Sequence, residues 1–210
     1  CYAESRPSGT HGQMRTADWL RVIDQAAGLG VTAVQFIGGE PALHPDLVTL
    51  VAHALDRDLQ VEIFSNLVHA RPVLWELFSV PGVSLATSYY SDVPTQHEEI
   101  TGRRGSHAKT RANIVEAIRR EIPLRVGVID LGDEQCWQQA VAELETLGVT
   151  AISYDRLRQV GRGVRDAAGH EPVVRELRQR CRSDLTYGRG VAVRVHSLDA
   201  FGKRARMQLG

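Results

Sequence analysis

The stretch VTAVQFIGGEP, residues 31–41, is an apolar run that stops at two glycines, a glutamate and a proline. The run Val31–Ile37 predicts a buried strand, and Pro41 prevents that strand from continuing. Gly38 and Gly39 have no Cβ and tolerate positive φ, so their backbone can approach a ligand closely. Glu40 adds a fixed negative charge beside that backbone, which suits an ammonium group. The stretch therefore predicts a strand that ends in a ligand-binding turn.

Helix patterns alternate with short apolar strand patterns along the chain. Helices are predicted at residues 17–29, 45–58, 72–79, 106–120 and 133–147, and strands at 31–37, 60–65, 83–88, 124–129 and 151–154. Thr16 is the expected N-cap of the first helix, and Gly30 is its expected end. Strands separated by helices imply right-handed βαβ units and a parallel sheet. The spacing predicts an α/β fold, a TIM-like (β/α) barrel or partial barrel with five visible strands. With a sixth strand expected before Cys1, the fold is a partial (β/α)6 TIM-like barrel that lacks its first strand.

Polar residues follow the ends of the predicted strands, where barrels of this kind place their working groups. They are Gly38–Glu40, Ser65 and Asn66, Thr87–Tyr89, Asp130, and Asp155 with Arg156. Each of them is also a plausible turn former or helix cap, and for Ser65 and Asn66 taken singly that is the better interpretation. The functional hypothesis depends on their shared position at one end of the sheet.

Composition bounds the remaining possibilities. The chain has 210 residues, 43% of them hydrophobic, and a formal net charge of zero, as expected for one soluble domain without a nucleic-acid footprint. It contains no apolar run long enough to span a membrane and no signal-peptide pattern, so the cytoplasm is the expected location. Cys1, Cys136 and Cys181 form no CxxC pair, which argues against a disulfide framework and a self-contained zinc site. The eight histidines lack metal-ligand spacing, and most are expected at surface or capping positions.

The order of these features resembles the radical S-adenosylmethionine superfamily. Cys1 and Tyr2 precede the strand and its Gly-Gly-Glu-Pro turn, and Cys1 matches the last ligand of the family's Cys-x3-Cys-x2-Cys signature. The sequence begins at that cysteine without an initiator Met, so it is interpreted as a fragment whose other two cluster ligands lie upstream. The family often has Ser-x-Asp-Gly after the fourth barrel strand, whereas residues 87–92 read TSYYSD here.

The resemblance implies a 4Fe-4S cluster and S-adenosylmethionine as cofactors, with Cys1 as a cluster ligand. It implies reductive cleavage of S-adenosylmethionine to a 5′-deoxyadenosyl radical that abstracts hydrogen from a C–H bond. The implied cofactor contacts are Gly38, Gly39, Glu40 and Pro41 at the methionyl amine, Ser65, Asn66 and Ser88 at its carboxylate or the ribose, Arg111 at the carboxylate, and Val128 and Ile129 beside the adenine.

A second resemblance concerns the substrate. Gly161-Arg162-Gly163, which follows Arg156 and Arg158, is similar to the segment that leads into the SPASM extension of peptide-modifying members. It implies a ribosomally made peptide as substrate and an external electron donor. Auxiliary iron-sulfur clusters would require thiolates, and only Cys181 follows this segment. The expected organisation is a radical core over residues 1–163 and a partly ordered C-terminal extension over residues 164–210.

Two other hypotheses remain open at this point. The cysteine-poor C-terminal region favours a non-catalytic or decayed domain of the same fold that acts as a binding module. A lyase or aldolase without a cluster would need a Schiff-base lysine or a metal triad at the strand ends, but Lys109 and Lys203 both lie outside the predicted strands.

Overall fold

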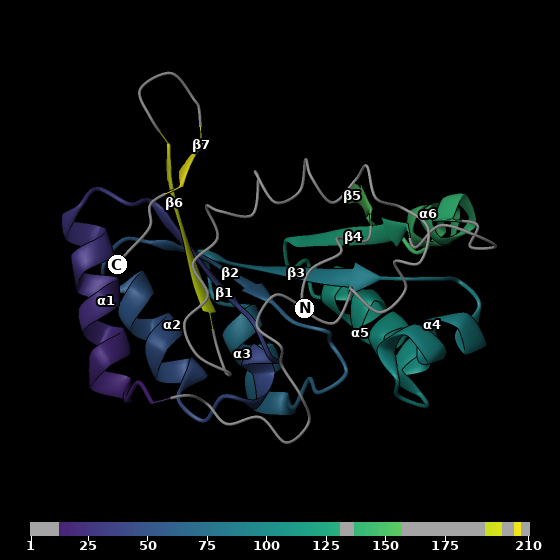
Figure 1. Cartoon of the computed structure of the whole chain (residues 1–210), viewed down its shortest axis with the longest axis horizontal. Coiled ribbons are helices and arrows are strands. Elements are labelled where there is room, and N and C mark those ends of the chain that lie inside the picture. The colour runs from purple at the N-terminus through teal and green to yellow at the C-terminus, as the bar shows by residue number, and fades with distance from the viewer. Residues whose placement is uncertain (1–12, 131–136, 157–191, 199–203, 207–210) are drawn as a thin grey trace, which may run out of the picture. The chain divides into compact units, whose positions relative to one another are not determined.

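A computed structural model of the chain describes residues 13–130, 137–156, 192–198 and 204–206. The chain divides into two compact units, which are described separately (Figure 1). The first unit comprises Cys1–Phe64 and Arg158–Gly210, and the second comprises Ser65–Leu157.

The first unit is built on a pair of parallel strands extended by two strands from late in the sequence. Its elements are α1 (Thr16–Gly28), β1 (Ala33–Ile37), the 3-10 turn η1 (Pro41–Leu43), α2 (Leu47–Leu55), β2 (Gln60–Phe64), β6 (Ala192–Leu198) and β7 (Arg204–Arg206). β1 pairs in parallel with β2 on one edge and antiparallel with β6 on the other, and β7 pairs antiparallel with β6. β1, which carries the glycine turn, is therefore an inner strand of this unit.

The core of the first unit lies on one face of β1 and β2. Alternate strand residues point to opposite faces, and the register places Val34 beside Val61 and Phe36 beside Ile63. These four side chains are at most 1% exposed, and they share the core with apolar residues of the helices, namely Ile23, Ala26, Leu50, Val51 and Ala54. Gln35 and Glu62 occupy the alternate positions, and Gln35 donates a hydrogen bond to Glu62. The strands expected at residues 31–37 and 60–65 are therefore present, and their alternate residues define the core face of this unit.

The start of α1 differs from the prediction. Arg15, not Thr16, is the N-cap, and its backbone N–H donates to the Asp18 carboxylate at 2.9 Å. Thr16 is the first helical residue, and its hydroxyl donates to Asp46 Oδ2 at 2.8 Å. Since Asp46 is the N-cap of α2, this hydrogen bond joins the first turns of the two helices. The prediction of a Thr16 cap was wrong because the hydroxyl has a partner distant in sequence.

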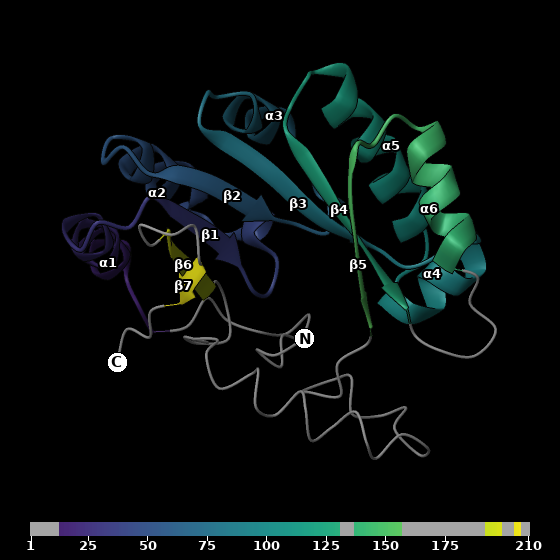
Figure 2. The ribbon, with the colours of Figure 1, turned by 90° about the horizontal axis from the view of Figure 1, so that it is seen from above.

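The second unit repeats the alternation of strand and helix. Its elements are α3 (Pro72–Phe78), β3 (Val83–Tyr89), α4 (Pro94–Thr101), α5 (Ser106–Arg119), β4 (Leu124–Asp130), α6 (Trp137–Thr146) and β5 (Ala151–Arg156). The strands are parallel, with β4 between β3 and β5. Figure 2 shows α3, α5 and α6 on one side of these three strands, and the opposite face, which none of these three described helices covers, is called the helix-free face below. The sequence did not predict α4, whose eight residues PTQHEEIT carry almost no apolar pattern.

The predicted α/β class with parallel strands and alternating helices is confirmed in both units. β5 ends two residues later than expected. The C-terminal extension, which was expected to be partly ordered, contributes β6 and β7 to the first unit. Residues 164–191 of that extension fall outside the described residues.

Within the described part of the chain, no helix combines the length and the apolar character needed to cross a membrane.

Candidate cofactor-binding site

The predicted ligand turn of the first unit has an unusual backbone. Gly38 and Gly39, directly after β1, have φ of 95° and 48°. Side chains with a Cβ adopt such angles at a cost, so glycine at both positions allows the chain to turn sharply away from the strand. Gly39 is exposed and Gly38 is half-buried. The turn therefore presents backbone polar groups, rather than side chains, at the carboxyl end of β1.

Glu40 has a structural role in addition to its charge. It is the N-cap of η1, and its Oε1 accepts a hydrogen bond from the backbone N–H of Ala42 at 3.0 Å. Pro41 and Ala42 are buried beneath it. The helix-start role is thus real, and it also holds the carboxylate in one place beside Gly39.

His44 secures the segment between the turn and α2. Its ring is 6% exposed, and Nδ1 accepts a hydrogen bond from the backbone N–H of Asp46 at 3.1 Å. This histidine is a capping residue, as the sequence predicted for most histidines. The segment from Gly38 to α2 is therefore anchored by a buried proline and a buried imidazole.

In the second unit, Ser65 and Asn66 form a turn. Ser65 Oγ accepts from the backbone N–H of Leu67 at 3.0 Å, and Asn66 Oδ1 accepts from that of Val68 at 2.8 Å. Ser65 is only 1% exposed, whereas Asn66 is exposed. Leu67, which lies between Asn66 and Val68, has a φ of 54° and is buried. These bonds match the turn-former interpretation of the two residues.

The same turn is attached to α5. Thr110 Oγ1 donates to the carbonyl oxygen of Asn66 at 2.9 Å, and Asn113 Nδ2 donates to that of Leu67 at 2.5 Å. The backbone N–H of Ser65 donates to the carbonyl oxygen of Ala86 in β3 at 3.0 Å. The loop at residues 65–68 is therefore fixed between a strand and a helix of its own unit.

Ser88 and Ile129 lie on the helix-free face of the second unit. The register pairs Ser88 with Gly127 and Gly127 with Ser153, so these three residues form a row across the strands. Ile129 is on the same face two residues further along β4. A Cβ added to Gly127 would be in van der Waals contact with Ser153 Oγ at 3.5 Å, so glycine lets the neighbouring strands' side chains pack closely here.

Val128 lies on the opposite face from Ile129. It is fully buried on the helix side and is paired in register with Tyr89. Consecutive strand residues face opposite ways, so the expectation that Val128 and Ile129 both flank one ring does not match this geometry. Ile129 alone shares a face with Ser88.

Arg111 has a protein partner. Its Nε donates to Glu143 Oε1 of α6 at 2.7 Å, and this hydrogen bond raises the pKa of the guanidinium further. Arg111 therefore joins α5 to α6 within the helix layer, and the cofactor carboxylate contact expected for it stays a prediction.

Glu143 also belongs to a buried polar network that the sequence did not reveal. Tyr89 is completely buried, and its hydroxyl donates to Glu143 Oε2 at 2.6 Å. His107 Nε2 lies 2.8 Å from the same hydroxyl, which can accept the proton of that nitrogen. Burial and the Glu143 hydrogen bond raise the pKa of Tyr89 far above its usual range, so its hydroxyl keeps its proton. The network joins β3, α5 and α6.

His97 of α4 completes this buried group. Its ring centroid is 5.3 Å from those of Tyr89 and His107, and the residue is 1% exposed. Burial, and secondarily the neighbouring His107, lowers the pKa of His97 to about 4. His97 and His107 are therefore core residues, contrary to the surface or capping positions expected for most histidines. The only hint in the sequence was that Tyr89, His97 and His107 lie within or next to the long connection between the strand predicted at 83–88 and the helix predicted at 106–120.

The structure does not test the predicted iron-sulfur ligand, because all three cysteines, Cys1, Cys136 and Cys181, lie outside the described residues. Among the residues that are described, no three histidine, cysteine or carboxylate side chains gather in a way that could hold a metal ion. The donors in the described part, backbone amides, hydroxyls and carboxylates, suit the amino, carboxyl and ribose groups of an organic ligand.

Comparison with known proteins identifies the family. Residues 1–147 match the family described as the radical SAM superfamily. The chain is 31% identical over 129 residues to the PqqA peptide cyclase of Ruegeria pomeroyi, which covers 60% of this chain and 34% of that protein. It is 29% identical over 167 residues to the PqqA peptide cyclase of Xanthomonas campestris pv. campestris strain B100, covering 79% of this chain and 44% of the relative. The chain thus spans less than half the length of these curated relatives.

Solved structures show the same fold. Streptococcus suis SuiB bound to the precursor peptide SuiA superposes with a TM-score of 0.70 at 16% identity, covering 87% of this chain and 42% of that one. SuiB bound to S-adenosylmethionine superposes with a TM-score of 0.66, also at 16% identity, covering 81% and 40%.

Proposed function

Because the chain belongs to the radical SAM superfamily, we propose that it is the cofactor-binding core of an enzyme that modifies a ribosomally made peptide. The family implies S-adenosylmethionine and a 4Fe-4S cluster as cofactors. The peptide substrate is supported by the relatives, which are named PqqA peptide cyclases, and by the SuiB structure that holds a precursor peptide. An external electron donor and a cytoplasmic location complete the proposal.

The observation that carries this proposal is the turn after β1. Two consecutive glycines with positive φ expose backbone groups at the end of an inner strand, and Glu40 is fixed beside them by its bond to Ala42. A carbonyl oxygen and a carboxylate both accept hydrogen bonds from an ammonium group. These are the hydrogen-bond acceptors that the methionyl amine requires, so Gly38, Gly39 and Glu40 are its proposed ligands, with Pro41 fixing the turn.

The other proposed roles belong to the second unit and to Cys1. Ser88 would contact the ribose or the carboxylate, and Ile129, on the same strand face, would contact the adenine. The exposed Asn66 would reach the cofactor with its amide, while Ser65 shapes the turn that presents it. Cys1 is the proposed cluster ligand. When bound, the cluster and S-adenosylmethionine supply the abstraction of a hydrogen atom from a C–H bond.

The chain's own residues position these groups and keep part of the surroundings dry. Tyr89 and Val128, on the helix side of these strands, are both 0% exposed, so the sheet is shielded from water at these two positions. The hydrogen bonds of Thr110 and Asn113 hold the loop that bears Asn66. The turn after β1 is held by buried Pro41 and His44.

Gly39→Val tests the proposal. A β-branched side chain would cover the exposed backbone and resist the φ of 48°, so S-adenosylmethionine affinity should fall at least about tenfold, or roughly 1.4 kcal/mol. Isothermal titration of the chain with S-adenosylmethionine measures the loss directly. The expected cost in stability is about 1–3 kcal/mol.

Gly30→Val is the matched control. Gly30 lies in the same unit with a φ of 78°, and no atom lies within 4 Å of the position of an added Cβ. It therefore carries a similar backbone strain without touching the turn. Equal S-adenosylmethionine affinities for the two variants would show that the turn does not bind the cofactor.

A further inference from the structure

Five arginines on or next to the helices of the described structure are paired with carboxylates. Arg21 contacts Asp18, Arg57 contacts Asp24, Arg111 contacts Glu143, and Arg119 and Arg120 both contact Glu116. Such pairing neutralises the outer surface of a chain whose formal net charge is zero. Against this background, cations that have no carboxylate partner stand out.

Four basic residues of the second unit form such a group. We name His69, Arg71, Arg103 and Lys109 the cationic cluster. Within the described part of the chain, none of these residues forms an ion pair with a carboxylate, and Arg71, Arg103 and Lys109 are exposed. Arg103 Nη1 donates to His69 Nε2 at 2.8 Å, so two basic side chains of this cluster are in direct contact.

The contact between Arg103 and His69 is direct, and Lys109 and Arg71 are near enough to act on the His69 imidazole by charge. Burial, and then the charges of Arg103, Lys109 and Arg71 in that order, lower the pKa of its imidazole. No acidic residue contributes to that shift. Because Nε2 accepts the hydrogen bond from Arg103, His69 is neutral and the net charge of the cluster is carried by three exposed cations.

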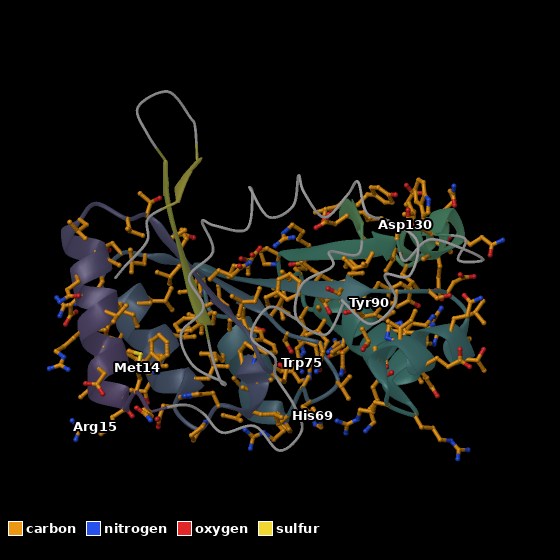
Figure 3. All side chains as sticks on the ribbon, in the orientation of Figure 1. Met14, Arg15, His69, Trp75, Tyr90 and Asp130 are labelled. Atoms are coloured by element: carbon orange, nitrogen blue, oxygen red, sulfur yellow. The ribbon has the colours of Figure 1, made fainter. Side chains whose placement is uncertain are left out.

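The cationic cluster is joined to the loop proposed to face the cofactor. His69 and Arg71 follow the turn at residues 65–68, and Lys109 precedes Thr110, whose hydroxyl holds the Asn66 carbonyl. Arg103 lies in the short connection between α4 and α5, directly before the first turn of α5. Figure 3 labels His69, which lies among nitrogen-tipped side chains. The loops that follow strands are where αβ barrels admit their substrates.

We propose that the cationic cluster binds an acidic segment of the peptide substrate. Three cations without a carboxylate partner in the described structure attract carboxylates, so they favour the binding of acidic peptides over peptides that lack carboxylates. The guanidinium groups of Arg71 and Arg103 can each donate two hydrogen bonds to a carboxylate. This assignment rests on the proposed function. It adds that the substrate segment bound next to the cofactor is negatively charged.

Fluorescence anisotropy tests the proposal with two synthetic probes. The first is a fluorescein-labelled ten-residue peptide with four glutamates, and the second has glutamine at those four positions. The full chain should bind the glutamate peptide at least tenfold more tightly. Affinity should fall as NaCl rises from 50 to 300 mM, because screening weakens exposed charge pairs. Equal affinity for the two peptides would overturn the proposal.

Two triple variants with the same change in net charge separate the cluster from general electrostatics. Arg71→Gln/Arg103→Gln/Lys109→Gln should lose at least tenfold in affinity for the glutamate peptide. Arg21→Gln/Arg57→Gln/Arg119→Gln removes three cations that are paired with carboxylates, and it should change the affinity less than threefold. Equal losses in both variants would mean that only the overall charge matters, which contradicts a site at the cluster.

Titration with S-adenosylmethionine keeps this inference distinct from the proposed function. The triple variant of the cationic cluster should bind S-adenosylmethionine as tightly as the unmodified chain does. A parallel loss of affinity for the peptide and for S-adenosylmethionine would reassign these cations to the cofactor. If the unmodified chain binds the glutamate peptide but not S-adenosylmethionine, the proposed function fails while the peptide site stands. Preferential binding of an acidic flavodoxin, with no binding of either peptide, would assign the cluster to an electron donor and overturn the peptide assignment.

Discussion

At the scale of single residues, Glu40 combines two roles that sequence reasoning treats as alternatives. Its carboxylate caps η1 through Ala42, and it is the proposed partner of the cofactor ammonium. A carboxylate has several acceptor positions, so one oxygen can hold the turn while the charge remains available to a cation. The two roles depend on different properties of the side chain, namely acceptor geometry and charge.

Glu40→Gln separates these properties. Glutamine keeps an acceptor oxygen for the Ala42 N–H, so the free energy of unfolding should change by less than about 1 kcal/mol and the melting temperature should change little. The charge-assisted bond to the ammonium group is lost, at a cost of roughly 1.5–3 kcal/mol, so S-adenosylmethionine affinity should drop at least tenfold. Calorimetric titration and a thermal melt measure both effects. Lowered stability with unaltered affinity would leave Glu40 as a helix-start residue alone.

The residues that sequence reasoning placed correctly are those whose role is local. Gly38 and Gly39 have the positive φ that their position after a strand suggested, and Ser65 and Asn66 have the turn bonds that their residue types favour. Arg111 could not be placed in this way, because its partner Glu143 is 32 residues away. The buried network of Tyr89 was missed for the same reason, since its partners come from two different helices.

At the scale of elements, hydrophobic periodicity predicted the strands and most helices within a few residues. α2 is shorter than expected, beginning at Leu47, because His44 and Asp46 bond to each other before the helix starts. α4 was missed because its eight residues bury only His97, which an apolar pattern does not detect. Helices held by buried polar groups are therefore the ones that pattern reasoning fails to find.

Tyr89→Phe tests how strongly the buried network joins β3, α5 and α6. The variant keeps the ring but leaves Glu143 Oε2 and His107 Nε2 without their common partner, at an expected cost of about 1–3 kcal/mol in the free energy of unfolding. Urea denaturation measures this loss.

Tyr154→Phe is the control, because the Tyr154 hydroxyl also donates to a carboxylate, that of Asp130 at 2.6 Å. Tyr154 is 44% exposed, so water can replace the lost bond and the expected cost is below about 1 kcal/mol. Similar costs for the two variants would mean that the buried network adds little to stability.

At the scale of the whole molecule, His97 should make folding sensitive to acid. Its pKa is about 4 in the folded chain and near 6.5 in the unfolded chain, so between these values the unfolded chain binds a proton that the folded chain does not. Stability should therefore decrease as the pH falls from about 6.5 to about 4, by up to about 3 kcal/mol from this group.

His97→Phe isolates that contribution from other titrating groups, among them His107, Glu98 and Glu143 nearby. Phenylalanine keeps an aromatic ring against Tyr89 and His107 and cannot be protonated. Urea denaturation at pH 7, 5.5 and 4 should show a smaller acid-induced loss for the variant than for the unmodified chain. Parallel losses in the two proteins would show that His97 is not responsible.

The pairing of β6 with β1 sets an order of events during synthesis. Ala33 in β1 pairs with His196 in β6, about 160 residues later, and translation at about 5–20 residues per second separates the two by roughly ten seconds or more. During that interval one edge of β1 lacks this partner, and unpaired edges bind other strands readily. The strand that carries the turn therefore gains its second neighbour only after β6 has left the ribosome. Cofactor loading is expected to follow the synthesis of β6 rather than that of β1.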